Sequence, residues 1–95
     1  MSVPVEAAGD GDARAVTAWL EEGGSVDARC SECGGITLLI TAAAGGQEAM
    51  VRMLLQRGAS VNLQGPLGVT ALMIAAGYGY TTTVQALLDA MKPEY

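Results

Sequence analysis

The sequence contains no histidine and no phenylalanine, and aromatic residues make up only 4% of the chain. The absence of histidine removes the commonest general base, the commonest metal ligand, and the base of Ser–His and Cys–His nucleophile pairs. The absence of phenylalanine leaves a core built mainly from Ala, Leu, Val and Met, and such small side chains suit closely packed helices better than a barrel or a sandwich. Both absences favour a helical protein without catalytic machinery.

Basic residues are also scarce. Five Lys and Arg against ten Asp and Glu give a net charge of −5. Nucleic acids and anionic membranes attract clustered Lys and Arg, so this balance argues against both as partners. No apolar run approaches the roughly 20 residues that span a bilayer, and the N-terminus does not resemble a signal peptide. We therefore expect a cytoplasmic or nuclear protein.

The charges are distributed unevenly along the chain. Residues 1–32 carry seven acids and two bases, whereas residues 33–95 carry three of each. Residues 58–88 carry no charge at all. Because a soluble protein rarely leaves so long an uncharged stretch wholly in water, we expect part of this stretch to be covered.

Two motifs recur in the same order. Gly35–Ala43 (GITLLITAA) returns 33 residues later as Gly68–Ala76 (GVTALMIAA), and Gly23–Asp27 (GGSVD) returns 35 residues later as Gly58–Asn62 (GASVN). The difference of two residues falls in the loop that carries the cysteines, where an insertion costs least. Repetition at this period predicts a stack of similar units.

Each unit predicts a short first helix, a tight turn, a second helix and a hairpin-like finger. We expect first helices at residues 38–44 and 71–76, each ended by glycine. The second helices have apolar residues three and four positions apart, the spacing of one buried helix face. Trp19 follows this spacing, so we expect it in the core.

The pattern resembles the ankyrin-repeat family, in which GxTPLHxAAxxGH precedes a VxLLL helix and GADVN. The matching positions are Gly35, Thr37, Leu39, Ala42, Ala43, Gly46, Val51, Leu54, Leu55, Gly58, Ala59, Val61 and Asn62, and then Gly68, Thr70, Leu72, Ala75, Ala76, Gly79, Val84, Leu87 and Leu88. The family proline and both histidines are replaced, the second histidine by Gln47 and Tyr80. We expect Tyr80 to pack internally.

This resemblance implies an all-α ankyrin-repeat solenoid of stacked helix–turn–helix units with short hairpin-like fingers. It implies one domain over residues 1–95, with repeats at about 4–29, 30–64 and 65–92 and a short tail at 93–95.

The resemblance also implies a noncatalytic protein–protein interaction module without a cofactor. Such a module binds partners through the finger tips and first helices on its concave side. The expected contacts are Arg29, Ser31, Glu32, Ile36, Leu38, Ala44, Gln64, Pro66, Leu67, Val69, Met73, Gly77 and Tyr78, with Glu6 and Asp10 extending the surface. Because this groove is acidic at one end and apolar at the other, we expect a protein partner with a basic stretch beside an apolar anchor.

The last helix suggests an alternative function. Terminal repeats normally have a polar outer face, but residues 81–91 carry charge only at Asp89. Either the threonines and Gln85 supply enough polarity and the tail folds back as a cap, or another chain segment covers this face. In the second case the chain is a homo-oligomeric assembly unit, or a piece of a longer ankyrin scaffold, that associates through the third repeat.

Cys30 and Cys33 form a CxxC sequence, which admits a third hypothesis of thiol or metal chemistry. Zinc needs four ligands, and two thiols without histidine do not complete a site. A thioredoxin-like motif needs a helix N-terminus in a βαβ unit, which is not predicted here. We therefore expect reduced, exposed thiols in a finger tip. The carboxylate pairs Asp10–Asp12 and Glu21–Glu22 are expected on a solvated face.

Overall fold

The computed structural model describes residues 2–92 of the chain. The expected tail at residues 93–95, and its role as a cap, lie outside the described residues. The elements, in chain order, are α1 (Val5–Asp10), α2 (Ala13–Glu21), β1 (Arg29–Cys30), the 3-10 turn η1 (Ser31–Cys33), β2 (Ile36–Thr37), α3 (Leu38–Ala44), α4 (Glu48–Gln56), the 3-10 turn η2 (Pro66–Gly68), α5 (Ala71–Tyr78) and α6 (Thr81–Met91).

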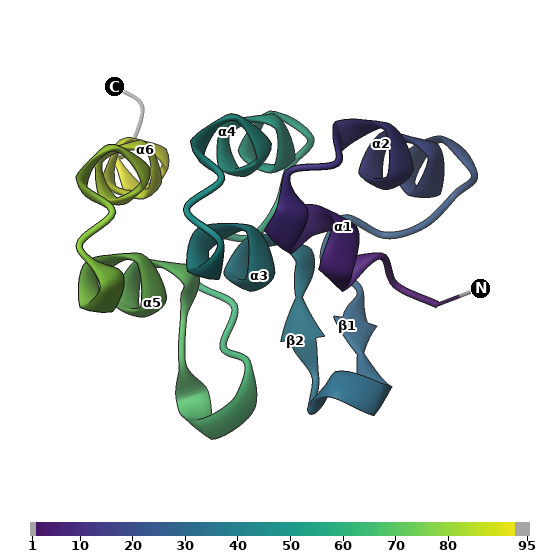
Figure 1. Ribbon diagram of the computed structural model, residues 1–95, viewed down its shortest axis with the longest axis horizontal. Helices are drawn as coiled ribbons and strands as arrows, with labels where there is room; N and C mark the ends of the chain where they lie inside the picture. Colours follow the sequence, from purple (N-terminus) through teal and green to yellow (C-terminus); the bar gives the residue numbers. More distant parts are fainter. Residues whose placement is uncertain (1, 93–95) are drawn as a thin grey trace.

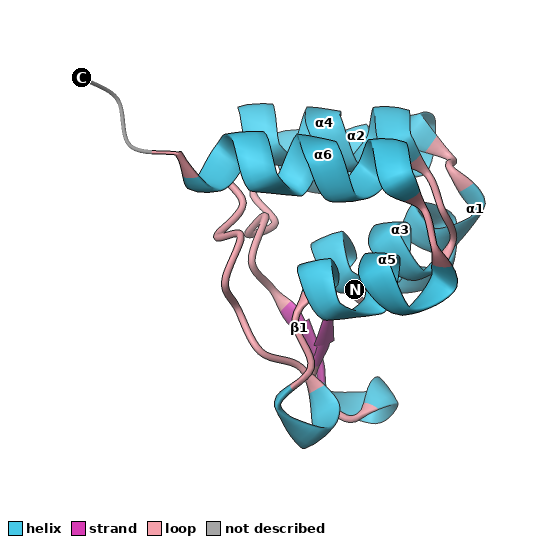
Figure 2. Cartoon of the chain, turned by 90° about the vertical axis from the view of Figure 1, so that its left-hand side faces the viewer, coloured by secondary structure: helices cyan, strands magenta, loops and turns pink. Residues whose placement is uncertain are grey.

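The helices form two layers. Helices α1, α3 and α5 lie side by side in one layer, and α2, α4 and α6 lie side by side in the other (Figure 1). The fingers extend from the side of the molecule that holds α1, α3 and α5, and they point away from α2, α4 and α6 (Figure 2). This arrangement confirms the expected solenoid of stacked helix–turn–helix units. Among residues 2–92, no helix is both long enough and apolar enough to cross a membrane.

The repeated Gly-x-Thr sequence sets where the first helices begin. The side-chain oxygen of Thr37 accepts a hydrogen bond from the backbone N–H of Ile40 at 3.2 Å, and that of Thr70 accepts one from Met73 at 3.3 Å. Each threonine therefore satisfies one of the free N–H groups at a helix start. The predicted first helix at residues 38–44 has the bounds of α3, whereas α5 extends two residues beyond the prediction.

The middle repeat forms the centre of the core. Five of the seven residues of α3 are buried: Leu38, Leu39, Ile40, Ala42 and Ala43. Helix α3 lies between α1 and α5, so its apolar side chains are covered on both sides (Figure 1). One helix pair cannot bury its own apolar face, and the stacked neighbours supply the missing cover.

Small residues let neighbouring repeats approach closely. A Cβ atom on Gly45 would overlap the backbone carbonyl oxygen of Gly9. Gln47 spans the same junction, because its Nε2 donates a hydrogen bond to that Gly9 carbonyl at 3.1 Å. At the next junction, the ring of Tyr80 lies on Gly46, which confirms that Tyr80 packs internally.

The loops after the second helices also connect repeats. The Asp27 carboxylate accepts hydrogen bonds from the Ser60 backbone N–H at 2.9 Å and from the Ser60 hydroxyl at 2.6 Å. Trp19 is half-buried against the core, as expected, and its ring lies on Gly24. The Asp27–Ser60 contact fixes the spacing of successive units, whereas the Trp19 ring holds the turn after α2 within the first repeat.

The two fingers differ in structure. Strands β1 and β2 of the finger before α3 pair antiparallel, with Arg29 opposite Thr37. The finger before α5 has no strand among the described residues and turns through η2. The Arg29 guanidinium donates hydrogen bonds to the backbone carbonyls of Gly35 at 3.1 Å and Gln64 at 2.5 Å. Arg29 therefore joins one finger to the next.

The close contact at Gly45 gives a first prediction. Gly45→Ala should lower the free energy of unfolding by about 1–3 kcal/mol, because its new methyl group meets the Gly9 backbone. Gly77→Ala is the matched control, since nothing lies within 4 Å of its added methyl group and alanine is the better helix former. Urea denaturation measures both. Equal effects of the two substitutions would contradict the packing described here.

A second prediction concerns Glu48, whose carboxylate lies near Thr82 of the next repeat. Its hydrogen bond with Arg52, at 2.8 Å, lowers the pKa of Glu48 below its ordinary value, and the nearby Thr82 hydroxyl lowers it further. The ionised Glu48 carboxylate therefore stabilises the folded chain at neutral pH, and this stabilisation is lost as the pH falls through the lowered pKa. Thr82→Ala should raise the pKa of Glu48 in an NMR titration, whereas the control Thr81→Ala should leave it unchanged. A pKa that moves equally in both variants would contradict the contact.

Candidate functional site

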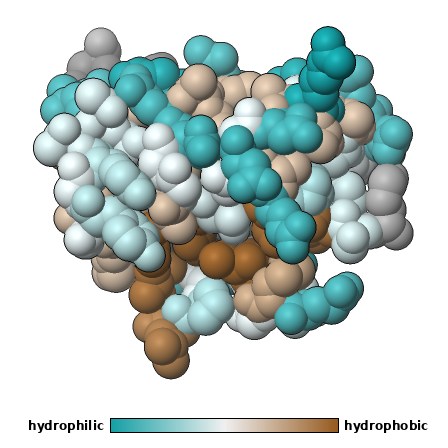
Figure 3. Space-filling view, in the orientation of Figure 1, coloured by the Kyte–Doolittle hydropathy of each residue, from teal (hydrophilic) through white to brown (hydrophobic). Residues whose placement is uncertain are grey.

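The candidate site is the surface on which the fingers lie beside the layer formed by α1, α3 and α5 (Figure 2), and we call it the concave surface. In the space-filling view, apolar surface lies between the helices and the fingers and continues onto the projecting finger before α5 (Figure 3). The structure places most predicted contacts where a partner can reach them. Exposed are Arg29, Ser31, Glu32, Gln64, Pro66, Leu67, Met73, Gly77 and Tyr78, and half-buried are Ile36, Ala44 and Val69.

Leu38 is the exception, and its prediction as a contact was wrong. Its side chain is fully buried in the core, with a relative exposure of 0%. Leucine replaces the proline that the family pattern has at this position, and an apolar side chain at the start of α3 is stabilised by burial. A partner on the concave surface cannot touch it.

Met73 also leaves the concave surface. Its counterpart one repeat earlier is Ile40, whose Cδ1 atom packs against Gly65 of the following repeat. Ile40 is 2% exposed, whereas Met73 is 58% exposed. By this equivalence, Met73 lies on the side of α5 that faces away from α3.

Leu67 dominates the apolar part of the surface. It is fully exposed at the tip of the finger, with φ at 61°, and it is the one non-glycine residue with positive φ among those described. The finger is closed below it by a hydrogen bond from the Gly65 N–H to the Val69 carbonyl at 2.7 Å. A left-handed backbone is costly for leucine, and such strain clusters at functional sites. Sequence reasoning named Leu67 as a contact but could not predict this conformation.

Tyr78 supplies a second exposed apolar group. Its ring stacks on that of Tyr80 with 5.5 Å between the ring centres. Because Tyr80 is itself held against Gly46, the exposed ring of Tyr78 has a firm support.

The opposite end of the surface is acidic. A hollow of about 310 Å³ lies between the N-terminal segment and the finger before α3, and the carboxylates of Glu6 and Glu32 both line it. Among the described residues neither carboxylate forms an ion pair. Its apolar walls include Val3, Pro4 and Val5. This end can therefore accept a basic side chain and its aliphatic stem.

The cysteines differ from expectation. Cys33 is exposed, as expected, but Cys30 is buried, and the two sulfurs are bonded to each other across η1, so the prediction of reduced thiols and of an exposed Cys30 was wrong. No group of three or more His, Cys, Asp or Glu residues that could hold a metal ion occurs in the described part of the chain. The structure thus provides no ligand set for zinc at this finger.

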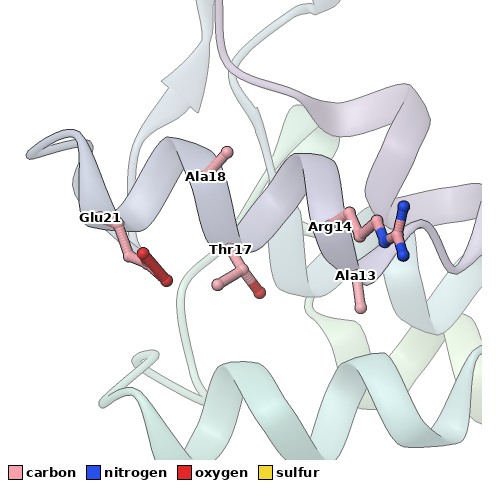
Figure 4. A pocket seen from close by; sticks show the side chains of 5 residues that line it. All are labelled: Ala13, Arg14, Thr17, Ala18 and Glu21. Atoms are coloured by element: carbon pink, nitrogen blue, oxygen red, sulfur yellow. The ribbon is translucent and has the colours of Figure 1, made fainter.

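A second hollow, of about 380 Å³, lies along α2 (Figure 4). Ala13, Thr17 and Glu21 project to one side of the helix there, with Arg14 near its start. The hollow has a single carboxylate and one guanidinium, and it offers no paired acid and base for proton transfer.

The carboxylate pairs are exposed, as expected. Asp10, Asp12, Glu21 and Glu22 all lie in solvent. Asp12 has a structural task, because its side chain accepts a hydrogen bond from the Ala15 N–H at 3.2 Å and caps α2.

Comparisons with known proteins agree with this geometry. The family model described as ankyrin repeats (3 copies) matches residues 5–94. The chain is 44% identical to the probable E3 ubiquitin-protein ligase XBOS33 of Oryza sativa subsp. japonica over 85 residues. This aligned segment is 88% of the chain and 16% of that protein. It is 49% identical over 63 residues to the ankyrin repeat and SAM domain-containing protein 6 of Rattus norvegicus, covering 66% and 7% respectively.

A third relative is the M-phase phosphoprotein 8 of Homo sapiens, 48% identical over 50 residues, or 53% of the chain and 6% of that protein. The chain therefore spans only a small part of the curated relatives that it matches. The family match extends over nearly all of its residues and agrees with the stacked helix pairs and fingers. The chain belongs to the ankyrin-repeat family.

Proposed function

We propose that the chain is a noncatalytic interaction module that binds a protein partner on its concave surface. Ankyrin repeats generally mediate protein–protein interaction, and the family is generally non-enzymatic. The compartment in which this would happen, cytoplasm or nucleus, remains a prediction.

The exposed Leu67 is the observation that carries this proposal. A fully exposed leucine gains nothing for folding, and its left-handed backbone is a cost to the free chain. Both features are explained if the side chain is buried in a complex. The supported ring of Tyr78 adds a second anchor of a residue type that is enriched at the centre of interfaces.

The charges indicate the chemistry of the partner. Glu6 and Glu32 border one hollow at the N-terminal end of the surface, whereas Leu67 and Tyr78 lie in the uncharged stretch of residues 58–88. A partner with Lys or Arg at one end and a large apolar side chain at the other would match both ends. One nitrogen of the Arg29 guanidinium donates to backbone carbonyls of both fingers, so in this proposal Arg29 positions the fingers while the rest of its exposed side chain contacts the partner.

A peptide library selected on the immobilised chain tests this function. The selected sequences should combine Lys or Arg with a large apolar residue. Leu67→Ala and Tyr78→Ala should each weaken binding of a selected peptide by about tenfold or more, because each removes a buried anchor. Leu88→Ala is the matched control, since Leu88 is an exposed apolar residue outside the concave surface.

Titration calorimetry gives the dissociation constants, and circular dichroism checks that the variants fold. If peptides bind the Leu67 and Tyr78 variants as tightly as they bind the wild type, the proposed surface is wrong. Selection of acidic peptides would contradict the proposed partner chemistry.

A further inference from the structure

The disulfide of the finger before α3 lies within the concave surface. Cys30 and Cys33 are joined across η1 with their Cα atoms 5.2 Å apart, a separation that is usual for a disulfide. Cys30 is buried, whereas Cys33 is exposed. A thiolate from solution can therefore reach the bridge from the side of Cys33, and access of this kind is a requirement for thiol–disulfide exchange.

The bridge acts locally. Its two cysteines are three positions apart in the sequence, so it closes a very short loop. A disulfide stabilises a fold mainly by restricting the unfolded chain, and this effect is smallest for short loops. The helices are held instead by the apolar core and by contacts between repeats, such as that of Gln47 with Gly9. Breaking the bridge should therefore change the finger and leave the stack folded.

Two glycines directly after the bridge allow η1 to move. Gly34 and Gly35 have φ values of 77° and 87°, and glycine adopts other backbone conformations at little cost. The Gly35 N–H donates a hydrogen bond to the Cys30 carbonyl at 2.8 Å, so a backbone contact and the sulfur bridge together hold η1 closed. Breaking the bridge removes one of these constraints, and η1 can then adopt other conformations.

One side of η1 forms a wall of the acidic hollow. Cys30, Glu32 and Cys33 line this hollow, opposite Glu6 of the N-terminal segment. Glu32 lies between the two cysteines in the sequence, so the bridge limits where its carboxylate can lie. The state of the bridge therefore affects the end of the concave surface that the proposed function assigns to a basic side chain.

The end of η1 also contacts the next finger. A Cβ atom placed on Gly34 would lie 3.2 Å from Cγ of Pro66, which directly precedes the exposed Leu67. Arg29, directly before Cys30, donates hydrogen bonds to the backbone carbonyls of Gly35 and of Gln64 in the next finger. A change in η1 is thus passed on to the finger that holds the apolar anchor.

We propose that the Cys30–Cys33 pair is a thiol–disulfide switch that regulates partner binding on the concave surface, an inference that rests on the function proposed above. The thiolate of a small monothiol attacks the sulfur of Cys33, the S–S bond breaks, and Cys30 leaves as a thiolate. A second monothiol attacks the sulfur of the first in the mixed disulfide and releases Cys33. Each released cysteine takes up the proton that an attacking thiol has lost. The bridge gains two electrons, the two monothiols are oxidised to one disulfide, and the reverse steps restore the bridge.

The bridged form should bind the partner more tightly. With the bridge intact, η1 and the Glu32 carboxylate are held in place before the partner arrives, and such preorganisation lowers the entropy cost of binding. After reduction, the partner must order η1 as it binds. We expect the reduced chain to bind a peptide that combines Lys or Arg with a large apolar residue about threefold to tenfold more weakly.

The first test follows the switch without a partner. The full chain is equilibrated in mixtures of reduced and oxidised glutathione, and alkylation with mass spectrometry measures the bridged fraction. This fraction should change reversibly with the ratio of the two forms. Amide NMR signals of residues 29–37 and 64–69 should differ between the bridged and reduced chains, whereas those of α4 and the helical circular dichroism should not. Failure of the bridge to form or to reopen, or unchanged amide signals at residues 64–69, would overturn the proposal.

The second test measures binding by calorimetry, with one peptide selected on the bridged chain. Cys33→Ser is the matched control, because it removes the bridge at the exposed cysteine and leaves the buried Cys30 in place. This variant should bind as weakly as the reduced wild type in either buffer. Equal affinity of the bridged and reduced wild type would overturn the switch and leave the proposed function standing. If no peptide binds either form, the proposed function fails, and the regulation inferred from it fails with it.

Discussion

The close contact between neighbouring first helices is the constraint on which the rest of the structure depends. Helix α3 lies between α1 and α5, and glycine at Gly9 and Gly45 allows backbone to approach backbone. Without large aromatic side chains, the core gains its stability from many small apolar groups at short range. This contact sets how the repeats stack. The stacking in turn sets where the fingers lie and which side chains stay exposed.

The fold could be predicted from the sequence because the same solution appears more than once. The recurrence of Gly-x-Thr and of the Ala-rich segment fixed the period, and the bounds of α3 followed from a threonine cap and a glycine stop. The conformation of Leu67 could not be predicted, because Gly65, Pro66 and Gly68 permit several turns. The burial of Leu38 and the pairing of Cys30 with Cys33 depend on packing around the finger, which a position in a repeat does not reveal.

The two surfaces arise from the same repetition in different ways. The concave surface consists of positions that stacking leaves uncovered, so its side chains stay accessible to a partner, as those of Leu67 and Tyr78 are. The other surface, which includes Met73, consists of positions that stacking covers in the middle repeat, as it covers Ile40, and these positions have no neighbour among the described residues. Exposed apolar side chains therefore have two separate origins in this chain. The repeat pattern alone assigned Leu67 and Met73 to the same concave surface.

Native-state hydrogen exchange measures most directly whether stacking on both sides is the source of stability. The account predicts that the amides of α3 exchange most slowly, through global unfolding, because α3 has a neighbour on each side. The amides of α6 should exchange faster through local opening of the last repeat. If α6 were as strongly protected as α3 in the monomeric chain, or if α3 opened independently of its neighbours, the central claim would be contradicted.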